Sequence, residues 1–226
     1  MRSPIRAICF DLFTLFDPRS VVKVAQRYVP AQAAELCDAW RVRQFEYSWL
    51  RVAAGRYTDF RAVTEEALVY AAHARGVTLS PGARDAMVAA YSQLDPWPDA
   101  RAHLAEWKAQ KLQLAPLANY APAMIEQLLT HAGFEPFFDA LISTDRARTF
   151  KPDPRAYALG MEVLGRRREE IAFAAFGAWD AVGAAWFGYP TFWVNRAGSP
   201  AEELGVSADA TGPGCAELVA FVRSNR

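Results

Sequence analysis

The sequence has little that would draw it to a polyanion or a membrane. Its 25 lysines and arginines balance 25 aspartates and glutamates, so the formal net charge over 226 residues is zero. A neutral chain has no field that would gather nucleic acid or anionic lipid. Asp11 interrupts the first apolar stretch, residues 5–16, which argues against a signal peptide. We therefore expect a cytoplasmic protein whose partner is a small molecule.

Cysteine and lysine are both scarce. The three cysteines are odd in number, have no metal-type spacing and lie among apolar neighbours: Cys9, Cys37 and Cys215. This pattern favours reduced core residues over functional ones. Only four of the 25 basic residues are lysines, so a lysine would seldom occur at a motif position by chance.

Hydrophobic residues make up 52% of the chain, and one apolar stretch has the length of a membrane span. Residues 171–194 carry a single charge, Asp180. Glycines and a proline interrupt this stretch, at Gly177, Gly183, Gly188 and Pro190. The pattern therefore predicts a strand over 171–175, a helix over about 180–187 and a strand over 191–194, all buried in an α/β core.

Short apolar runs alternate with helical patterns, which is typical of a doubly wound, Rossmann-like parallel sheet. The remaining predicted strands are 5–10, 112–117 and 140–143. About 100 residues without a convincing strand separate the first two, too many for a crossover. They carry helical patterns near 20–28, 31–53, 60–75 and 82–93. We therefore predict a core of residues 1–17 and 97–226 with an inserted helical cap domain, residues 18–96.

Polar side chains follow the predicted strands. In open α/β sheets, ligands bind beyond the carboxyl ends of the strands. The residues found there are Asp11, Thr14, Asn119, Lys151 and Asp180. We expect them to meet at one edge of the sheet.

Asp11 and Lys151 have the chemistry of a nucleophile and its counter-ion. A carboxylate at a strand end can act as a nucleophile, although a turn or N-cap aspartate fits the position equally well. Lys151 lies in a loop stiffened by Pro152 and Pro154, and an ammonium beside Asp11 would keep the carboxylate ionised and attract an anion. A surface lysine is the alternative. The helix that Pro154 opens could aim Tyr157 at the same place, or bury it in the core.

In the predicted helix 31–53, Arg41 interrupts an apolar face that four-residue spacing assigns to Cys37, Arg41, Phe45 and Trp49. Such an arginine either extends to solvent or binds an anion in a pocket. The histidines lie in helical patterns and have no Ser or Cys partner at a strand end, and we interpret them as ordinary helix-surface or core residues: His73, His103 and His131.

Taken together, the motifs Phe10-Asp11-Leu12-Phe13-Thr14-Leu15-Phe16-Asp17, Asn119, Lys151-Pro152-Asp153 and Trp179-Asp180 resemble those of the haloacid dehalogenase superfamily. Residues 40–51, 55–60 and 178–181 are similar to the L-2-haloacid dehalogenase branch in particular. The resemblance implies a Rossmann-like core with a helical cap and the active site between them. It also implies a homodimer, a small anionic carboxylate substrate, a halide product and no metal or other cofactor.

The resemblance assigns roles to individual residues. It makes Asp11 the nucleophile that displaces halide and forms an aspartyl ester, which water then hydrolyses. Thr14 would form a hydrogen bond to Asp11, and Arg41 would receive the halide. Lys151 would hold the carboxylates of Asp11 and the substrate, and Asp180 would orient Lys151. Tyr157 would be a further catalytic residue. The substrate-binding residues would be Phe13, Phe45, Phe60, Ala118, Asn119, Gly177 and Trp179.

The sequence departs from the family pattern at four places. The glycine expected in the turn after Asp11 is missing, and the tyrosine of that motif is Phe13. The hydroxyl of the second motif is replaced by Ala118. Serines and an asparagine of the last motif are replaced by Ala175, Phe176 and Gly177. Each lost hydrogen bond to a charged group would cost roughly 1.5–3 kcal/mol. The superfamily's phosphatases need an aspartate two residues after the nucleophile, where this chain has Phe13.

Three hypotheses follow. The leading one is a 2-haloacid dehalogenase acting through Asp11. The second keeps Asp11 as nucleophile but changes the electrophile, for example to a strained cyclic amino acid whose ring is opened. The third is a catalytically impaired protein that binds carboxylates.

Overall fold

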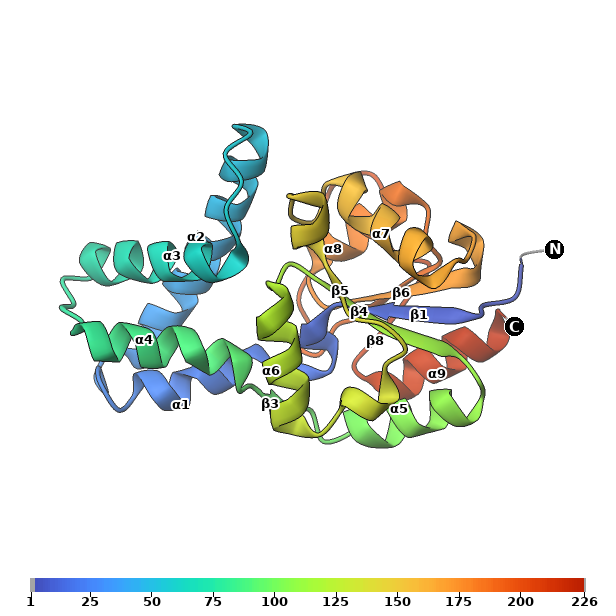
Figure 1. Cartoon of the computed structure of the whole chain (residues 1–226), viewed down its shortest axis with the longest axis horizontal. Helices are drawn as coiled ribbons and strands as arrows, with labels where there is room; N and C mark the ends of the chain where they lie inside the picture. Colours follow the sequence, from blue (N-terminus) through green and yellow to red (C-terminus); the bar gives the residue numbers. More distant parts are fainter. Residues whose placement is uncertain (1–2, 226) are drawn as a thin grey trace.

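The computed structural model describes residues 3–225, and a six-stranded parallel sheet forms its centre (Figure 1). The strand order is β5-β4-β1-β6-β7-β8. The strands are β1 (Ala7–Phe10), β4 (Gln113–Ala118), β5 (Ile142–Ser143), β6 (Ile171–Ala175), β7 (Thr191–Val194) and β8 (Ala210–Gly212). The predicted α/β class with a doubly wound sheet is confirmed.

Helices cover both faces of this sheet (Figure 1). One face carries α7 (Pro154–Leu164) and α8 (Ala178–Phe187), and the other carries α5 (Ala100–Ala109), α6 (Pro122–Ala132) and α9 (Cys215–Ser224). Strands β1 and β6 are fully buried, which explains their continuous apolar sequences. Within residues 3–225, none of the helices has the length and hydropathy that a bilayer crossing needs.

A second group of helices lies beyond one end of the sheet (Figure 1). It consists of α1 (Val21–Ala25), α2 (Ala33–Ala53), α3 (Phe60–Ala74) and α4 (Pro81–Ala89). Two short antiparallel strands connect it to the sheet: β2 (Phe16–Asp17) and β3 (Asp95–Pro96). We call α1–α4 the helical layer. The domain limits at 17/18 and 96/97 stay a prediction.

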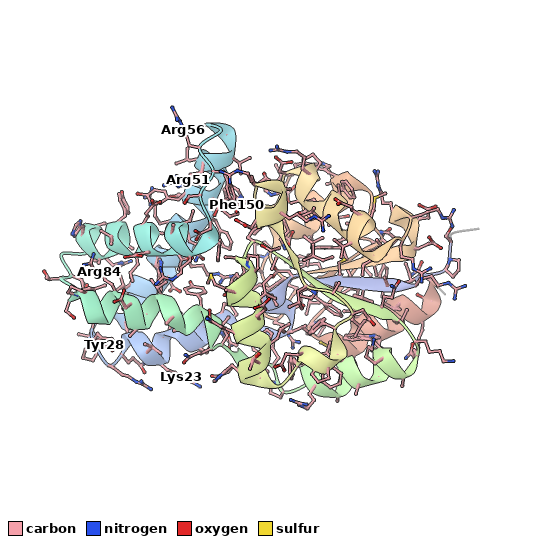
Figure 2. The ribbon with its side chains drawn as sticks, in the orientation of Figure 1. Lys23, Tyr28, Arg51, Arg56, Arg84 and Phe150 are labelled. Carbon is pink, nitrogen blue, oxygen red and sulfur yellow. The ribbon has the colours of Figure 1, made fainter. Side chains whose placement is uncertain are left out.

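The helical layer shares one apolar cluster with the sheet side of the molecule. Phe150 lies at their junction (Figure 2), where its ring contacts those of Tyr57 and Phe60 at 5.1 and 6.1 Å. Arg51 and Arg56 lie toward the far end of α2, at the surface (Figure 2). The carboxyl ends of the strands therefore face a wall made by α2 and α3.

Candidate active site

Strand β1 delivers Asp11 to the centre of this edge. Strand β1 lies between β4 and β6. The Asp11 amide continues the hydrogen bonding between β1 and β6 by donating to the carbonyl of Ala174 at 2.9 Å. A short 3-10 helix, η1 (Leu12–Thr14), follows at once. Asp11 is its N-cap, because Oδ2 accepts from the Phe13 amide at 3.2 Å. The turn and N-cap interpretation of Asp11 is confirmed. Asp11 also lines a cavity, and its role as a nucleophile stays a prediction.

Lys151 lies between two carboxylates. Its Nζ donates to Oδ1 of Asp11 at 3.0 Å and to Oδ2 of Asp180 at 2.7 Å. The Lys151 and Asp180 side chains are each 1% exposed, whereas Asp11 is 14% exposed. Burial opposes the ammonium form, but the two carboxylates outweigh it and raise the pKa of Lys151. The loop lysine is therefore a charged, fully buried counter-ion rather than a surface residue.

Asp180 is held from two sides. Its Oδ2 accepts from Lys151, and its Oδ1 accepts from the Tyr157 hydroxyl at 2.7 Å. Burial, followed by the charge of Asp11, raises the pKa of Asp180 to about 6 although Lys151 opposes the shift. Burial and Asp180 hold the pKa of Tyr157 well above its usual range, so its hydroxyl stays a donor. Tyr157 thus acts on Asp180 from within the core and does not line the cavity.

Two further predicted residues hold the backbone. Thr14 donates from Oγ1 to the backbone carbonyl of Asp11 at 2.6 Å, not to its carboxylate. Asn119 follows β4 and accepts at Oδ1 from the Lys151 amide at 2.8 Å. Asn119 therefore fixes the loop that carries Lys151, and it also lines the cavity.

The cavity itself is small and mostly apolar. Its free volume is about 20 Å³, room for about one water molecule. It is lined by Asp11, Leu12, Phe13, Arg41, Phe45, Phe60, Ala118, Asn119, Tyr120, Phe176, Gly177 and Trp179. All seven residues predicted to bind substrate are among them. A neighbouring cavity of about 180 Å³ shares Arg41, Phe45, Phe176, Gly177 and Trp179 and extends to Asn195 and Arg196.

Arg41 projects from α2 into an aromatic enclosure. Its Cζ lies 4.4, 5.1 and 5.8 Å from the ring centroids of Phe13, Phe45 and Phe176. Its Nη1 is buried and, among residues 3–225, has no hydrogen-bond partner. An unpaired guanidinium nitrogen at a cavity wall is suited to bind an anion. Of the two alternatives, extension to solvent or an anion site, this geometry favours the anion site.

Trp179 closes the cavity against the helical layer. Its ring packs on those of Phe45 and Trp49 at 5.1 and 5.5 Å. A Cβ at Gly177 would lie 2.7 Å from the Trp179 Nε1. Trp179 can hold this position only because residue 177 has no side chain.

The cavity wall also includes residues that the sequence did not mark as site residues. Leu12, Tyr120 and Phe176 line the cavity. Tyr91 lies close to Arg41: burial raises the pKa of the Tyr91 hydroxyl to about 12, and Arg41 opposes this shift. Adjacency to Asp11, Asn119 and Gly177 is the signal that could have found the first three. Nothing local marks Tyr91.

A family model described as haloacid dehalogenase-like hydrolase matches residues 5–188. The chain belongs to this family. Within the family, the (S)-2-haloacid dehalogenase of Pseudomonas sp. (strain YL) is 40% identical over 206 residues, 91% of this chain and 89% of the relative. The haloacetate dehalogenase H-2 of Moraxella sp. (strain B) is 37% identical, over 92% of this chain and 94% of that protein.

Solved structures place this family member in the L-2-haloacid dehalogenase branch. The L-2-haloacid dehalogenase of Xanthobacter autotrophicus matches with a TM-score of 0.92 at 36% identity, over 98% of this chain and 100% of that one. The same enzyme with chloropropionic acid covalently bound matches with a TM-score of 0.91 at 35% identity and the same coverage. The predicted family and branch are confirmed.

Proposed function

We propose that this protein is a 2-haloacid dehalogenase that uses Asp11 to break the carbon–halogen bond next to a carboxylate. One observation carries the proposal: Asp11 lines the cavity and is paired with the buried Lys151, while Arg41, whose buried Nη1 has no partner among residues 3–225, lines the same cavity. A haloacid brings one negative charge and releases another. Arg41 and Lys151, the latter shared between Asp11 and Asp180, supply positive charge for both events.

The reaction has two steps. A carboxylate oxygen of Asp11 forms a bond to the α-carbon while the carbon–halogen bond breaks, and the halide leaves with the bonding pair toward Arg41 Nη1. Water then adds to the Asp11 ester carbonyl and the ester bond breaks. This regenerates the carboxylate and yields a 2-hydroxy acid, with one proton released to solvent. The covalent chloropropionic acid complex of the Xanthobacter enzyme supports the ester intermediate.

The surrounding residues assist these steps. Lys151 would attract the substrate carboxylate and hold Asp11, and Asp180 with Tyr157 would hold Lys151 in turn. Phe45, Phe60 and Trp179 would keep water from the carbon–halogen bond. We expect the reaction to need no metal, so halide release should persist in the presence of a chelator.

The first prediction is that the purified protein releases chloride from chloroacetate or (S)-2-chloropropionate, and that Asp11→Asn lowers kcat by roughly 10³-fold or more because the nucleophile is lost. A halide electrode and chromatography of the hydroxy acid measure both products. In water enriched in ¹⁸O, repeated turnover should place label in the Asp11 carboxylate, which mass spectrometry of the peptide detects.

Asp85→Asn is the matched control, because Asp85 is exposed on α4. A folded wild-type protein that releases no halide from a panel of 2-haloacids would refute the proposal. Label in Asp11 with a strained cyclic amino acid as the only active substrate would favour the second hypothesis. A rise in melting temperature with small carboxylates, without any adduct on Asp11, would favour the impaired binding protein.

A further inference from the structure

Two carbonyls of the turn that carries Asp11 are bound by side chains from distant parts of the chain. We call residues 11–15 the nucleophile turn. The Asp11 carbonyl accepts within the turn, from the Thr14 amide at 3.0 Å and the Thr14 hydroxyl at 2.6 Å. The Phe13 carbonyl accepts from the indole Nε1 of Trp97 at 3.0 Å. The Thr14 carbonyl accepts from Arg196, at 3.0 Å from Nη2 and 3.3 Å from Nε.

Phe13 links the Trp97 contact to the nucleophile. The Phe13 amide donates to Asp11 Oδ2, and the Phe13 carbonyl is the group that Trp97 holds. The backbone amide of Trp97 also donates to the Leu15 carbonyl at 2.9 Å. The Phe13–Thr14 peptide plane contains the Phe13 carbonyl and also the Thr14 amide, which donates to the Asp11 carbonyl, so rotation of the plane would loosen the turn that presents Asp11.

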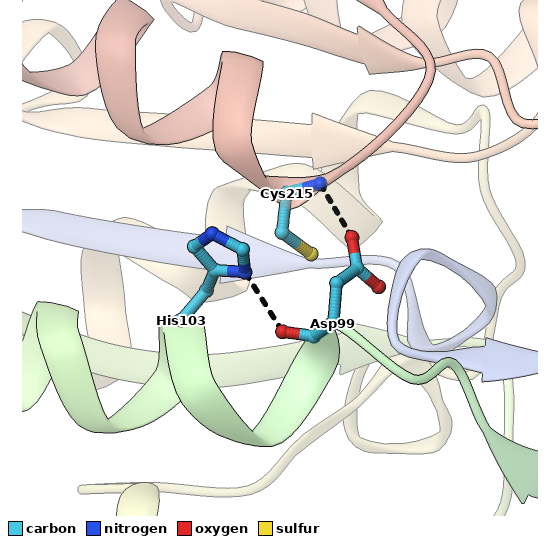
Figure 3. A group of neighbouring side chains, drawn as sticks. All are labelled: Asp99, His103 and Cys215. Atoms are coloured by element: carbon cyan, nitrogen blue, oxygen red, sulfur yellow. Dashed lines mark hydrogen bonds between the residues drawn. The ribbon is translucent and has the colours of Figure 1, made fainter.

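Arg196 is itself rigidly placed. Its Nη2 donates to Asp99 at 2.9 Å (Oδ1) and 3.2 Å (Oδ2), and its guanidinium lies 4.7 Å from the Trp97 ring centroid. The Arg196 side chain is 11% exposed. Asp99 also accepts from the Cys215 amide at 2.9 Å, at the start of α9 (Figure 3). Two core helices thus anchor Arg196, because Asp99 is the N-cap residue of α5.

The same cluster has the outline of a cation site, since ligand atoms of Asp99, His103 and Cys215 lie within 4.8 Å of one another. Its contacts argue otherwise. The Arg196 guanidinium already faces both Asp99 oxygens and the Cys215 Sγ, the latter at 3.3 Å. The His103 Nδ1 lies 2.7 Å from the Asp99 carbonyl (Figure 3). Burial raises the pKa of Cys215 to about 12, so it stays a thiol. The cluster is an anchor for Arg196.

We propose that Trp97 and Arg196 are positioning residues that hold the nucleophile turn and so keep Asp11 aligned between Lys151 and the substrate carbon. The proposal rests on the proposed function, since it assumes that Asp11 reacts. A misplacement of about 1 Å at a reacting atom can cost roughly 100-fold in rate. The two residues act through backbone carbonyls and touch no reacting atom.

The second prediction concerns Trp97→Phe, which keeps the ring but removes the N–H, and Arg196→Lys, which keeps the charge but not the planar fork. Each should lower kcat for halide release by about 10-fold to 100-fold with KM within about threefold of wild type. Arg196→Ala should lower kcat further than Arg196→Lys does, and guanidinium ion added to the assay should restore part of the kcat of Arg196→Ala. Circular dichroism and thermal melts establish that each variant is folded.

Arg19→Met is the matched control, because the Arg19 guanidinium also packs on the Trp97 ring, 5.4 Å from its centroid, but forms its ion pair with Asp17, outside the nucleophile turn. It should leave kcat unchanged. A rise in KM at constant kcat would overturn the proposal and assign Arg196 to substrate capture in the neighbouring cavity. Unchanged kcat in both Trp97→Phe and Arg196→Lys would also overturn it. An inactive wild-type protein refutes the proposed function itself, before any variant is compared.

Discussion

At the residue scale, the buried ion cluster has an uneven charge. One ammonium, Lys151, faces two carboxylates, Asp11 and Asp180, with Asp180 and Lys151 almost fully buried. Burial, and then the negative charge of Asp11, raise the pKa of Asp180 against the opposing charge of Lys151. The Tyr157 hydroxyl at 2.7 Å reduces the cost of keeping Asp180 ionised.

The third prediction follows from this pKa. Asp180 binds its proton more tightly in the folded state, with a pKa of about 6, than in the unfolded state. Between pH 4 and pH 6 the folded state therefore holds more protons, so the free energy of unfolding falls as pH rises, by up to about 3 kcal/mol from this group. Asp180→Asn should lack this decrease. Urea denaturation of both proteins from pH 4 to pH 7 measures it.

Asp85→Asn serves as the comparison, since Asp85 is exposed. Its unfolding free energy should follow the wild-type curve across the pH range. Parallel curves for Asp180→Asn and wild type would contradict the raised pKa of Asp180.

At the scale of elements, the strands that could be predicted from the sequence are those made of continuous apolar residues. Strands 171–175 and 191–194 agree with β6 and β7, because both are buried on every side. The two-residue strands β2 and β3 were not predicted, since each has only one pair of residues and no periodicity. Strand β8 was also not predicted, because its residues are partly exposed and include a glycine.

Part of the site could be predicted from strand positions alone. Residues after parallel strands meet at one edge, so Asp11, Asn119 and Asp180 could be selected from their positions. The function of Trp97 and Arg196 could not be predicted, because they bind backbone carbonyls 84 and 182 residues away. Hydrogen bonds to backbone leave no pattern in residue type at the acceptor.

The segment after β6 sets the size of the cavity. Phe176 packs on Phe13 at 6.0 Å, and Gly177 allows Trp179 to fold over it. These rings leave a free volume of only about 20 Å³. A longer substrate must therefore either displace an aromatic side chain or extend into the neighbouring cavity of about 180 Å³.

The fourth prediction is that kcat/KM for chloroacetate exceeds that for 2-chlorobutyrate by at least about 10-fold, the discrimination that one or two methylenes provide. Phe176→Ser should lower this ratio because it removes a ring from the cavity wall. Trp186→Ser removes a ring from the exposed surface of α8 and should leave the ratio unchanged. A ratio near one in the wild-type protein would contradict a size limit.

At the scale of the whole molecule, the helical layer and the sheet meet along a continuous apolar cluster. The cavity lies where they meet, with Arg41 and Phe45 from α2 opposite Asp11 and Trp179. Neither part forms the site alone. Large apolar side chains on the outside of the layer, Val42 and Leu50, are 58% and 61% exposed.

The fifth prediction is a homodimer, as the resemblance of the sequence implies. Apolar side chains exposed on α2 would gain from burial against a second copy. Analytical ultracentrifugation at micromolar concentration should give twice the monomer mass. Leu50→Glu should lower the fraction of dimer, whereas Asp85→Asn on α4 should not. A monomer at every concentration would refute the prediction.

The Asp11–Lys151 contact spans 140 residues of sequence, and Asp180 lies further along still. The nucleophile leaves the ribosome before its counter-ion, which follows about 7–28 s later at ordinary synthesis rates of about 5–20 residues per second. The Asp11 amide also needs the Ala174 carbonyl of β6 as its partner. A nascent chain therefore carries no assembled reactive carboxylate. Chemical competence arises only after β6 and Asp180 have been synthesised.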